Sequence, residues 1–331
     1  MEHTDLYING TWRPGSEGTR FDVLNPADET VLASVASATI ADADDALNAA
    51  EAAMAEWATR TPRARSEILR RAWELMTERL DDFARIITLE NGKARTDAMG
   101  EAIYAAEFFR WFSEEAVRSD GIIKHAPATG ARIIVQYKPA GIGVLVTPWN
   151  YPAAMGTRKI APALAAGCAV IIKPASETPL TMLALMPLLE EAGVPKGLVN
   201  VLPSRQTGAL VDHLMHDPRV RVISFTGSTE VARIINRTLA SRDGVLPPLI
   251  AETGGQNAMI VDSTALTEQV TRDVLMSSFQ SAGQRCSALR VLFVQDDVAK
   301  RGSSYNWLVD LLRRRFNCFG NTLGHGFRRR F

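Results

Sequence analysis

Apolar and polar residues follow two successive patterns in the first third of the chain. Between residues 7 and 36 they alternate around turn dipeptides such as Asn9-Gly10, which predicts short β-strands joined by tight turns. Between residues 40 and 118 apolar residues recur every three or four positions, which predicts several amphipathic helices. Thr61-Pro62 marks a break between two of these helices. We therefore expect a β-ribbon followed by helices that pack on a later sheet.

From residue 140 onward, apolar runs alternate with stretches of helical periodicity. Apolar runs of this kind are typical of buried parallel strands joined by crossover helices. The pattern predicts an α/β fold with a Rossmann-like, doubly wound parallel sheet, although the Gly-x-Gly-x-x-Gly sequence usual for dinucleotide binding is missing. The alternating segments are 143–147, 152–167, 169–173, 179–192, 198–202, 207–216, 220–225 and 228–240, followed by strands at 249–252 and 258–261 and a helix at 264–282.

Composition narrows the class of protein. The chain of 331 residues has 46% hydrophobic and 22% charged residues, which is ordinary for a globular protein with a sizeable core. Basic and acidic residues both number 37, so no overall field favours nucleic acid or an anionic membrane. The apolar run 160–172 contains Pro162 and is shorter than the roughly 20 residues that a membrane-spanning helix needs. Because the polar start also lacks a signal-peptide pattern, we expect a cytoplasmic protein that binds neither nucleic acid nor a membrane.

Two segments suggest chemistry. The three cysteines have no metal-ligand spacing, so neither a disulfide framework nor a metal site is expected. Cys168 lies in an apolar run and is expected in the core, whereas Cys286 lies among small residues after Arg285, a setting that suits an approachable thiolate. A lone cysteine is more often an inert core residue, so its context decides. Upstream, Glu252 precedes a Gly-Gly pair and offers a general base with room for a substrate, so the two segments together favour covalent catalysis on a carbonyl group.

Three further segments supply that context: Pro-Trp-Asn-Tyr-Pro at 148–152, Lys-Pro-Ala-Ser-Glu at 173–177 and Phe-Thr-Gly-Ser at 225–228. Taken in order with the glutamate and cysteine segments, they resemble the NAD(P)-dependent aldehyde dehydrogenase superfamily, and the likeness runs from about Tyr7 to about Val298. One such motif is weak evidence, whereas five in the same order are specific. The resemblance also accounts for the missing glycine fingerprint, because these enzymes hold their cofactor by a different loop.

The resemblance implies an aldehyde dehydrogenase fold with a partial second α/β domain that carries the catalytic groups. Residues 1–121 and 140–247 would form the NAD(P)-binding domain, and 122–139 an oligomerisation strand segment, since the family forms homo-oligomers. Residues 248–299 would begin a catalytic domain that is truncated, because members of the family continue much further beyond the nucleophile. We interpret the arginine-rich tail 300–331 as an aberrant terminus, with a functional basic arm as the alternative.

The same resemblance implies roles for three residues. Cys286 would attack the aldehyde carbon as a thiolate, although a free thiol is mostly protonated at neutral pH, so its surroundings must favour the charged form. The side-chain amide of Asn150 and the backbone N–H of Cys286 would hold the oxyanion of the thiohemiacetal. Glu252 would activate the water that hydrolyses the thioester. Outside this set of motifs, Asn150 would be interpreted as a helix cap and Glu252 as a surface charge.

The resemblance also assigns residues to the cofactor. Lys173 would reach ribose hydroxyls or an adenosine phosphate, and the helix that follows Ser228 would offer free N–H groups to a pyrophosphate. Members that prefer NAD often have a glutamate three positions after this lysine, so the serine at that position here favours NADP or the use of both cofactors. The residues expected to bind NADP or NAD are Trp149, Lys173, Ser176, Gly227, Ser228 and Gly254.

Two substrates remain open. Residues 7–221 resemble bacterial succinate-semialdehyde dehydrogenases, and residues 226–298 resemble the glutamate-semialdehyde (pyrroline-5-carboxylate) dehydrogenase module of proline catabolism. We expect a small aldehyde substrate that bears a carboxylate, with succinate semialdehyde favoured. A cofactor-binding fragment without catalysis is an alternative of a different class. A thiol hydrolase without a cofactor would need a histidine partner, and no motif places a histidine near Cys286.

Overall fold

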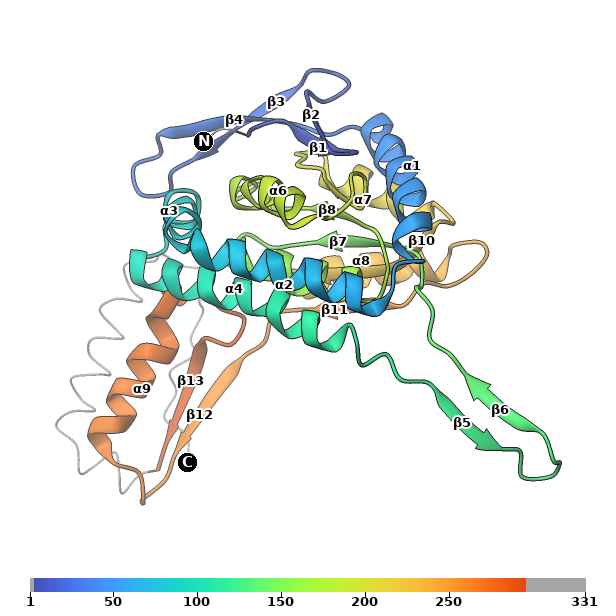
Figure 1. Ribbon diagram of the computed structural model, residues 1–331. Helices are drawn as coiled ribbons and strands as arrows, with labels where there is room; N and C mark the ends of the chain where they lie inside the picture. The colour runs from blue at the N-terminus through green and yellow to red at the C-terminus, as the bar shows by residue number, and fades with distance from the viewer. Residues whose placement is uncertain (1–2, 296–331) are drawn as a thin grey trace. The chain divides into compact units, whose positions relative to one another are not determined.

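The computed structural model describes residues 3–295 and divides into two compact units, one that ends at Thr253 and one that begins at Gly254 (Figure 1). The tail 300–331 lies outside the described residues. The larger unit contains a seven-stranded sheet, and the predicted α/β class with a parallel core is confirmed. Its strands are, in spatial order, β11 (Leu249–Glu252), β10 (Val220–Thr226), β7 (Ile142–Val146), β8 (Val170–Lys173), β9 (Val199–Val201), β1 (Leu6–Ile8) and β2 (Thr11–Arg13).

The sheet is doubly wound around its central parallel strands. β7 and β8 are buried along their whole lengths, as their runs of valine, isoleucine and leucine require. The chain places β8 and β9 on one side of β7 and later places β10 and β11 on the other, so the order reverses between β7 and β10. Such a reversal is the usual ligand position in open α/β sheets. The connecting helices are α5 (Ala154–Ala165), α6 (Leu180–Ala192), α7 (Thr207–His216) and α8 (Thr229–Ala240).

The predicted β-ribbon and helices of the first third are both present. β1 pairs antiparallel with β9, so the start of the chain completes the sheet. The Thr61 hydroxyl accepts a hydrogen bond from the N–H of Ala64 at 3.2 Å, which caps α2. Helices α2 and α4 pack side by side (Figure 1). The remaining elements are β3 (Arg20–Leu24), β4 (Val31–Ala36), α1 (Ile40–Trp57), α2 (Pro62–Glu78), α3 (Leu80–Asn91) and α4 (Arg95–Glu115).

A hairpin follows α4, where the sequence placed an oligomerisation segment. Its strands, β5 (Ile122–His125) and β6 (Arg132–Val135), pair antiparallel, and the hairpin extends away from the helices of the larger unit (Figure 1). Ile123 is 74% exposed and Ile134 is 63% exposed. The oligomerisation role of residues 122–139 stays a prediction. Across residues 3–295, no helix combines the length and the apolar character needed to cross a membrane.

The smaller unit has its own short parallel pair of strands. β12 (Asn257–Val261) and β13 (Leu289–Val294) are joined through α9 (Thr267–Phe279) and the 3-10 turn η1 (Gln280–Gly283). Val261, Val274 and Leu289 form its buried apolar cluster within the described residues. The strand predicted at 249–252 is β11, and it pairs with β10 in the larger unit. The start of a catalytic domain at residue 248 stays a prediction.

Candidate active site

The predicted motifs of the larger unit follow strands that end at the same level. Val146 of β7 pairs with Lys173 of β8 and with Phe225 of β10, and Thr226 of β10 pairs with Glu252 of β11. Because these strands are parallel, their carboxyl ends form one edge of the sheet, at which the strand order reverses. The predicted site residues at this carboxyl edge are Trp149, Asn150, Lys173, Ser176, Gly227, Ser228 and Glu252.

The loop after β7 is fixed by side chains from the helical layer. The carbonyl of Trp149 accepts a hydrogen bond from Asn91 Nδ2 at 2.8 Å. The carbonyl of Asn150 accepts one from Lys93 Nζ at 2.9 Å, and Lys93 is also paired with Glu101. The sequence analysis did not identify these partners. The segment that carries the predicted oxyanion donor is therefore held through its backbone.

The end of β8 presents a buried cation. Lys173 is 3% exposed, and burial lowers its pKa to about 8, while the nearby Glu177 carboxylate opposes that shift. The hydroxyl of Ser176 donates to the carbonyl of Ser204 at 3.0 Å. The position three residues after the lysine therefore holds a neutral side chain that already binds the backbone, whereas the carboxylate next to it is exposed.

The turn after β10 requires glycine and opens a helix. A Cβ at Gly227 would lie 2.5 Å from the ring of Phe225, so a larger residue would have to displace that ring. Ser228 caps α8, because its Oγ accepts from the N–H of Val231 at 3.2 Å. The buried hydroxyl of Thr226 has no hydrogen-bond partner among the described residues. This turn therefore offers helix N–H groups beside a polar atom that a ligand would satisfy.

A second buried lysine lies in the neighbourhood of Glu252. Lys159 on α5 is 8% exposed, and its Nζ donates to the hydroxyl of Ser224 at 2.7 Å. Burial and, to a smaller extent, the charge of Arg158 lower the pKa of Lys159 to about 8, although the carboxylate of Glu252 opposes both. The sequence analysis missed this residue. Its signal was a lysine three positions after the buried Gly156 of α5, on a stripe where helix periodicity calls for an apolar side chain.

Cys286 lies in the smaller unit, in the turn that precedes β13, and it is exposed. Its carbonyl accepts from Asn257 Nδ2 at 2.6 Å, and the same amide group donates to the carbonyl of Ala288 at 3.0 Å. Arg285 donates to Gln280 Oε1 at 2.8 Å. Cys168 is buried, as its apolar run predicted. The thiol segment is thus an exposed turn that the side chain of Asn257 ties to β12.

The structure brings together the site residues of the larger unit but leaves two of the predicted residues outside that unit. Gly254 and Cys286 belong to the smaller unit. The convergence of the thiol with Asn150 and Glu252 therefore stays a prediction, as does the role of Gly254 beside the nicotinamide.

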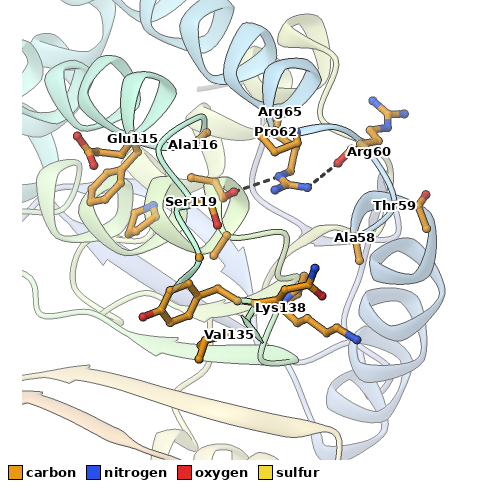
Figure 2. A pocket seen from close by; sticks show the side chains of 18 of the residues that line it. Ala58, Thr59, Arg60, Pro62, Arg65, Glu115, Ala116, Ser119, Val135 and Lys138 are labelled. Atoms are coloured by element: carbon orange, nitrogen blue, oxygen red, sulfur yellow. Dashed lines mark hydrogen bonds between the residues drawn. The ribbon is translucent and has the colours of Figure 1, made fainter. Parts of the chain in front are cut away.

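A groove in the larger unit lies at the C-terminal end of α5, whereas the loop that carries Asn150 precedes the N-terminal end of this helix. It has a volume of about 980 Å³ and is lined by the α1–α2 turn, the end of α4, the β5–β6 hairpin and the end of α5. Figure 2 shows Arg65 in its wall, where this side chain donates to the carbonyls of Arg60 at 2.6 Å and Ala165 at 3.0 Å. Among the described residues, its lining includes none of the predicted catalytic or cofactor-binding positions. The groove is therefore not the candidate site.

Comparisons with known proteins decide the family. The model of the aldehyde dehydrogenase family matches residues 12–306. The chain belongs to the aldehyde dehydrogenase family. The resemblance expected from about Tyr7 to about Val298 is thereby confirmed, and the match ends a few residues further along the chain.

Relatives within the aldehyde dehydrogenase family act on semialdehydes, according to their names. The chain is 43% identical over 270 residues to a succinate-semialdehyde dehydrogenase of Paenarthrobacter nicotinovorans, covering 82% of this chain and 59% of the relative. It is 42% identical over 294 residues to the NADP(+) succinate-semialdehyde dehydrogenase GabD of Escherichia coli, covering 89% and 60%. A glutarate-semialdehyde dehydrogenase of Pseudomonas aeruginosa is 40% identical over 309 residues, covering 93% and 62%.

A solved structure agrees with the fold. The succinate-semialdehyde dehydrogenase of Burkholderia pseudomallei superposes with a TM-score of 0.88 at 37% identity, covering 95% of this chain and 63% of that chain. The aldehyde dehydrogenase fold expected from the motifs is confirmed. The chain spans about 60% of the length of the relatives that it matches. The separate resemblance of residues 226–298 to glutamate-semialdehyde dehydrogenase stays a prediction.

The carboxyl edge suits a dinucleotide of the kind that the family uses. Lys173 supplies a cation at the end of β8, and the start of α8 supplies backbone N–H groups. The unpartnered hydroxyl of Thr226 lies at the end of β10, directly before the turn that opens α8. These donors match phosphate and ribose oxygens in chemical type.

Proposed function

We propose that this chain oxidises a small carboxylate-bearing semialdehyde to the corresponding acid with NADP or NAD, and that succinate semialdehyde is the favoured substrate. The level ends of β11, β10, β7 and β8 carry the proposal, because they bring the predicted oxyanion donor, general base and cofactor residues to one edge. The substrate class comes from the names of the relatives, of which several are succinate-semialdehyde dehydrogenases. Glutarate semialdehyde and glutamate semialdehyde are the alternatives.

The proposed chemistry begins at the sulfur. The Cys286 thiolate forms a bond to the aldehyde carbon, and the carbonyl oxygen becomes an alkoxide that the Asn150 amide and the Cys286 N–H stabilise. A bound dinucleotide would supply the acceptor for the hydride of that carbon, and loss of the hydride would leave a thioester on the sulfur of Cys286. Glu252 then takes a proton from water, the resulting hydroxide adds to the thioester, and the acid departs as the thiolate is restored.

Lys173, Ser176, Gly227 and Ser228 are proposed to hold the dinucleotide, and Trp149 and Gly254 to border it. NADP is favoured over NAD because the side chain of Ser176 is neutral and would not repel a 2′-phosphate, for which Lys173 supplies a cation. Glu177 is the competing observation, since its carboxylate interacts with the Lys173 ammonium. The ratio of kcat/KM for NADP and NAD measures the balance between these two effects.

A cofactor-binding protein without turnover is the second candidate. It is supported by the division of the chain, because most of the predicted cofactor residues belong to the larger unit with its extensive core, whereas the thiol belongs to the smaller unit. Binding and chemistry are therefore separable properties of this chain. The two candidates differ in whether reduced cofactor accumulates.

The test follows the absorbance of reduced nicotinamide with succinate semialdehyde and either cofactor, beside a direct measurement of cofactor binding. The oxidoreductase proposal expects steady turnover that Cys286→Ser abolishes while cofactor binding is retained. Lys173→Ala is expected to weaken cofactor binding about tenfold or more through the loss of a charge-assisted contact. Cofactor binding without turnover in the wild-type chain would favour the second candidate, and the absence of both would exclude the two together.

A further inference from the structure

A buried ion pair lies against the segment that carries Asn150. Lys93 lies in the link between α3 and α4, and Glu101 lies on α4. Both side chains are 0% exposed, and they form an ion pair with each other. Buried charges need further hydrogen bonds to offset the loss of water. The other partners of the two groups therefore show what the pair holds in place.

Both charges contact the loop between β7 and α5. Lys93 Nζ donates to the Asn150 carbonyl at 2.9 Å and lies 3.7 Å from the centre of the Tyr151 ring, a cation–π contact. Glu101 Oε1 accepts from the backbone N–H of Ala153 at 2.9 Å and of Ala154 at 3.3 Å. One ion pair thus holds this loop on both sides of Pro152.

Helix capping explains only the Glu101 half of this arrangement. Two other buried carboxylates also bind backbone N–H groups at helix starts: Asp42 accepts from Thr39 at α1, and Glu90 accepts from Leu180 at α6. A cap needs acceptors for helix N–H groups, and a bond donated to the carbonyl of Asn150 supplies none. The Lys93 contact therefore does something other than cap α5.

We propose that Lys93 and Glu101 are positioning residues that fix the backbone of Asn150 and thereby the direction of its side-chain amide. The inference rests on the proposed function, because it matters for catalysis only if that amide holds an oxyanion. Such a donor accelerates a reaction only when it is already aimed at the developing charge. A displacement of about 1 Å is enough to cost on the order of a hundredfold in rate.

The main test is the double variant Lys93→Met/Glu101→Gln. It removes both charges, so neither is left unpaired in the core, and the glutamine keeps an acceptor for the Ala153 N–H. The Asn150 carbonyl loses its donor. The expected result is a fall in kcat of about tenfold to a hundredfold, with the KM for the aldehyde changed less than about threefold.

A mutant cycle with Asn150→Ala separates a loss of positioning from a general loss of stability. On an Asn150→Ala background, the double variant is expected to lower kcat no further, because the group on which it acts is already gone. Asp42→Asn is the matched control: it alters a buried carboxylate at a helix start that is not bonded to the Asn150 loop, so it should lower the melting temperature and leave kcat unchanged.

Hydrogen exchange supplies a readout independent of turnover. The double variant should lose protection in the peptide that spans residues 149–154 and keep it in the strands β7 and β8. A folded double variant with wild-type kcat, or losses that multiply with that of Asn150→Ala, would overturn the inference. If the wild-type chain has no activity, the proposed function fails, and hydrogen exchange alone tests whether Lys93 and Glu101 fix the backbone of Asn150. Loss of protection confined to residues 149–154 would support that role, and unchanged protection would overturn it.

Discussion

Two backbone carbonyls at predicted catalytic residues are held by different kinds of donor. In the larger unit, the carbonyl of Asn150 is bound by Lys93, whose charge is buried and paired with Glu101. In the smaller unit, the carbonyl of Cys286 is bound by the neutral amide of Asn257, at 2.6 Å. A buried charge is a stronger donor than an amide, and it needs a surrounding core that keeps water out. The difference therefore reflects what the described residues of each unit bury.

The cores of the two units differ accordingly. In the larger unit, apolar side chains from the sheet and from the helices around it form one cluster, in which Trp57 and Phe109 are fully buried. The described part of the smaller unit buries Val261, Val274 and Leu289, with partly buried residues around them. A small core leaves a larger share of its surface in water and contributes less stability. The thiol turn consequently depends on local hydrogen bonds, whereas the Asn150 loop depends on the core beneath it.

The largest expected effect tests this contrast with two matched truncations. Phe109→Ala removes a fully buried ring from α4 and should lower the free energy of unfolding by about 3–5 kcal/mol. Phe279→Ala removes a partly buried ring from α9 and should cost about 1–2 kcal/mol, because less apolar surface returns to water. Calorimetry, which records the unfolding of both units, measures the two losses. Equal losses would show that the smaller unit is packed as tightly as the larger one.

The second prediction concerns the pH dependence of stability that the buried carboxyl group of Glu90 causes. Burial raises the pKa of Glu90 from 4.5 to about 7, although hydrogen bonds from Thr181 and Leu180 favour its charged form. Between these two pH values the folded protein keeps a proton that the unfolded chain has released. The contribution of Glu90 is therefore full below about pH 4.5, falls as the pH rises and is lost above about pH 7.

Glu90→Gln measures that contribution. Relative to the variant, the wild-type protein should lose about 3 kcal/mol of unfolding free energy between pH 4.5 and pH 7, since one pKa unit corresponds to about 1.4 kcal/mol. Urea denaturation at several pH values gives the difference, and other titrating groups cancel because they are shared. If the difference does not change with pH, Glu90 stays charged in the folded protein. Burial would then not raise the pKa of its carboxyl group.

The elements of the sheet were predictable because each depends on local sequence. The buried strands have continuous apolar runs, and Thr61-Pro62 and Gly227-Ser228 mark helix starts through their own side chains and turns. The family motifs then gave the order of the candidate residues. The level ends of four strands were not visible in the sequence, because register depends on how separate strands pair.

The Lys93–Glu101 ion pair and the buried Lys159 were missed for a related reason. Glu101 lies on the same buried stripe of α4 as Ala98 and Ala105, and Lys159 lies on a buried stripe of α5. A charged residue at such a position signals a buried charge, and the sequence analysis did not use that signal. The partner could not be inferred, because Lys93 reaches Glu101 and the Asn150 loop through the tertiary packing of three separate segments. Spacing alone carries no information about such a contact.

The smallest expected effect tests the smaller unit. Asn257→Ala removes two bonds between β12 and the thiol turn, one to the carbonyl of Cys286 and one to that of Ala288. Each bond is worth about 0.5–1.5 kcal/mol, so the turn should open more often and the rate of Cys286 alkylation by iodoacetamide should rise up to about tenfold. Mass spectrometry of the labelled peptide measures that rate, with the buried Cys168 as a slow internal reference.

Gln256→Ala is the matched control, because this exposed neighbour lies beside Asn257 and just before β12. It should leave the alkylation rate of Cys286 unchanged. If Asn257→Ala also leaves it unchanged, the turn is held by something other than these two bonds, such as the left-handed backbone of Ser281 and Ala282, with φ of 55° and 54°. The contrast between a carbonyl anchored by a buried charge and one anchored by a neutral amide would then no longer hold, because the thiol turn would keep its shape without its amide donor.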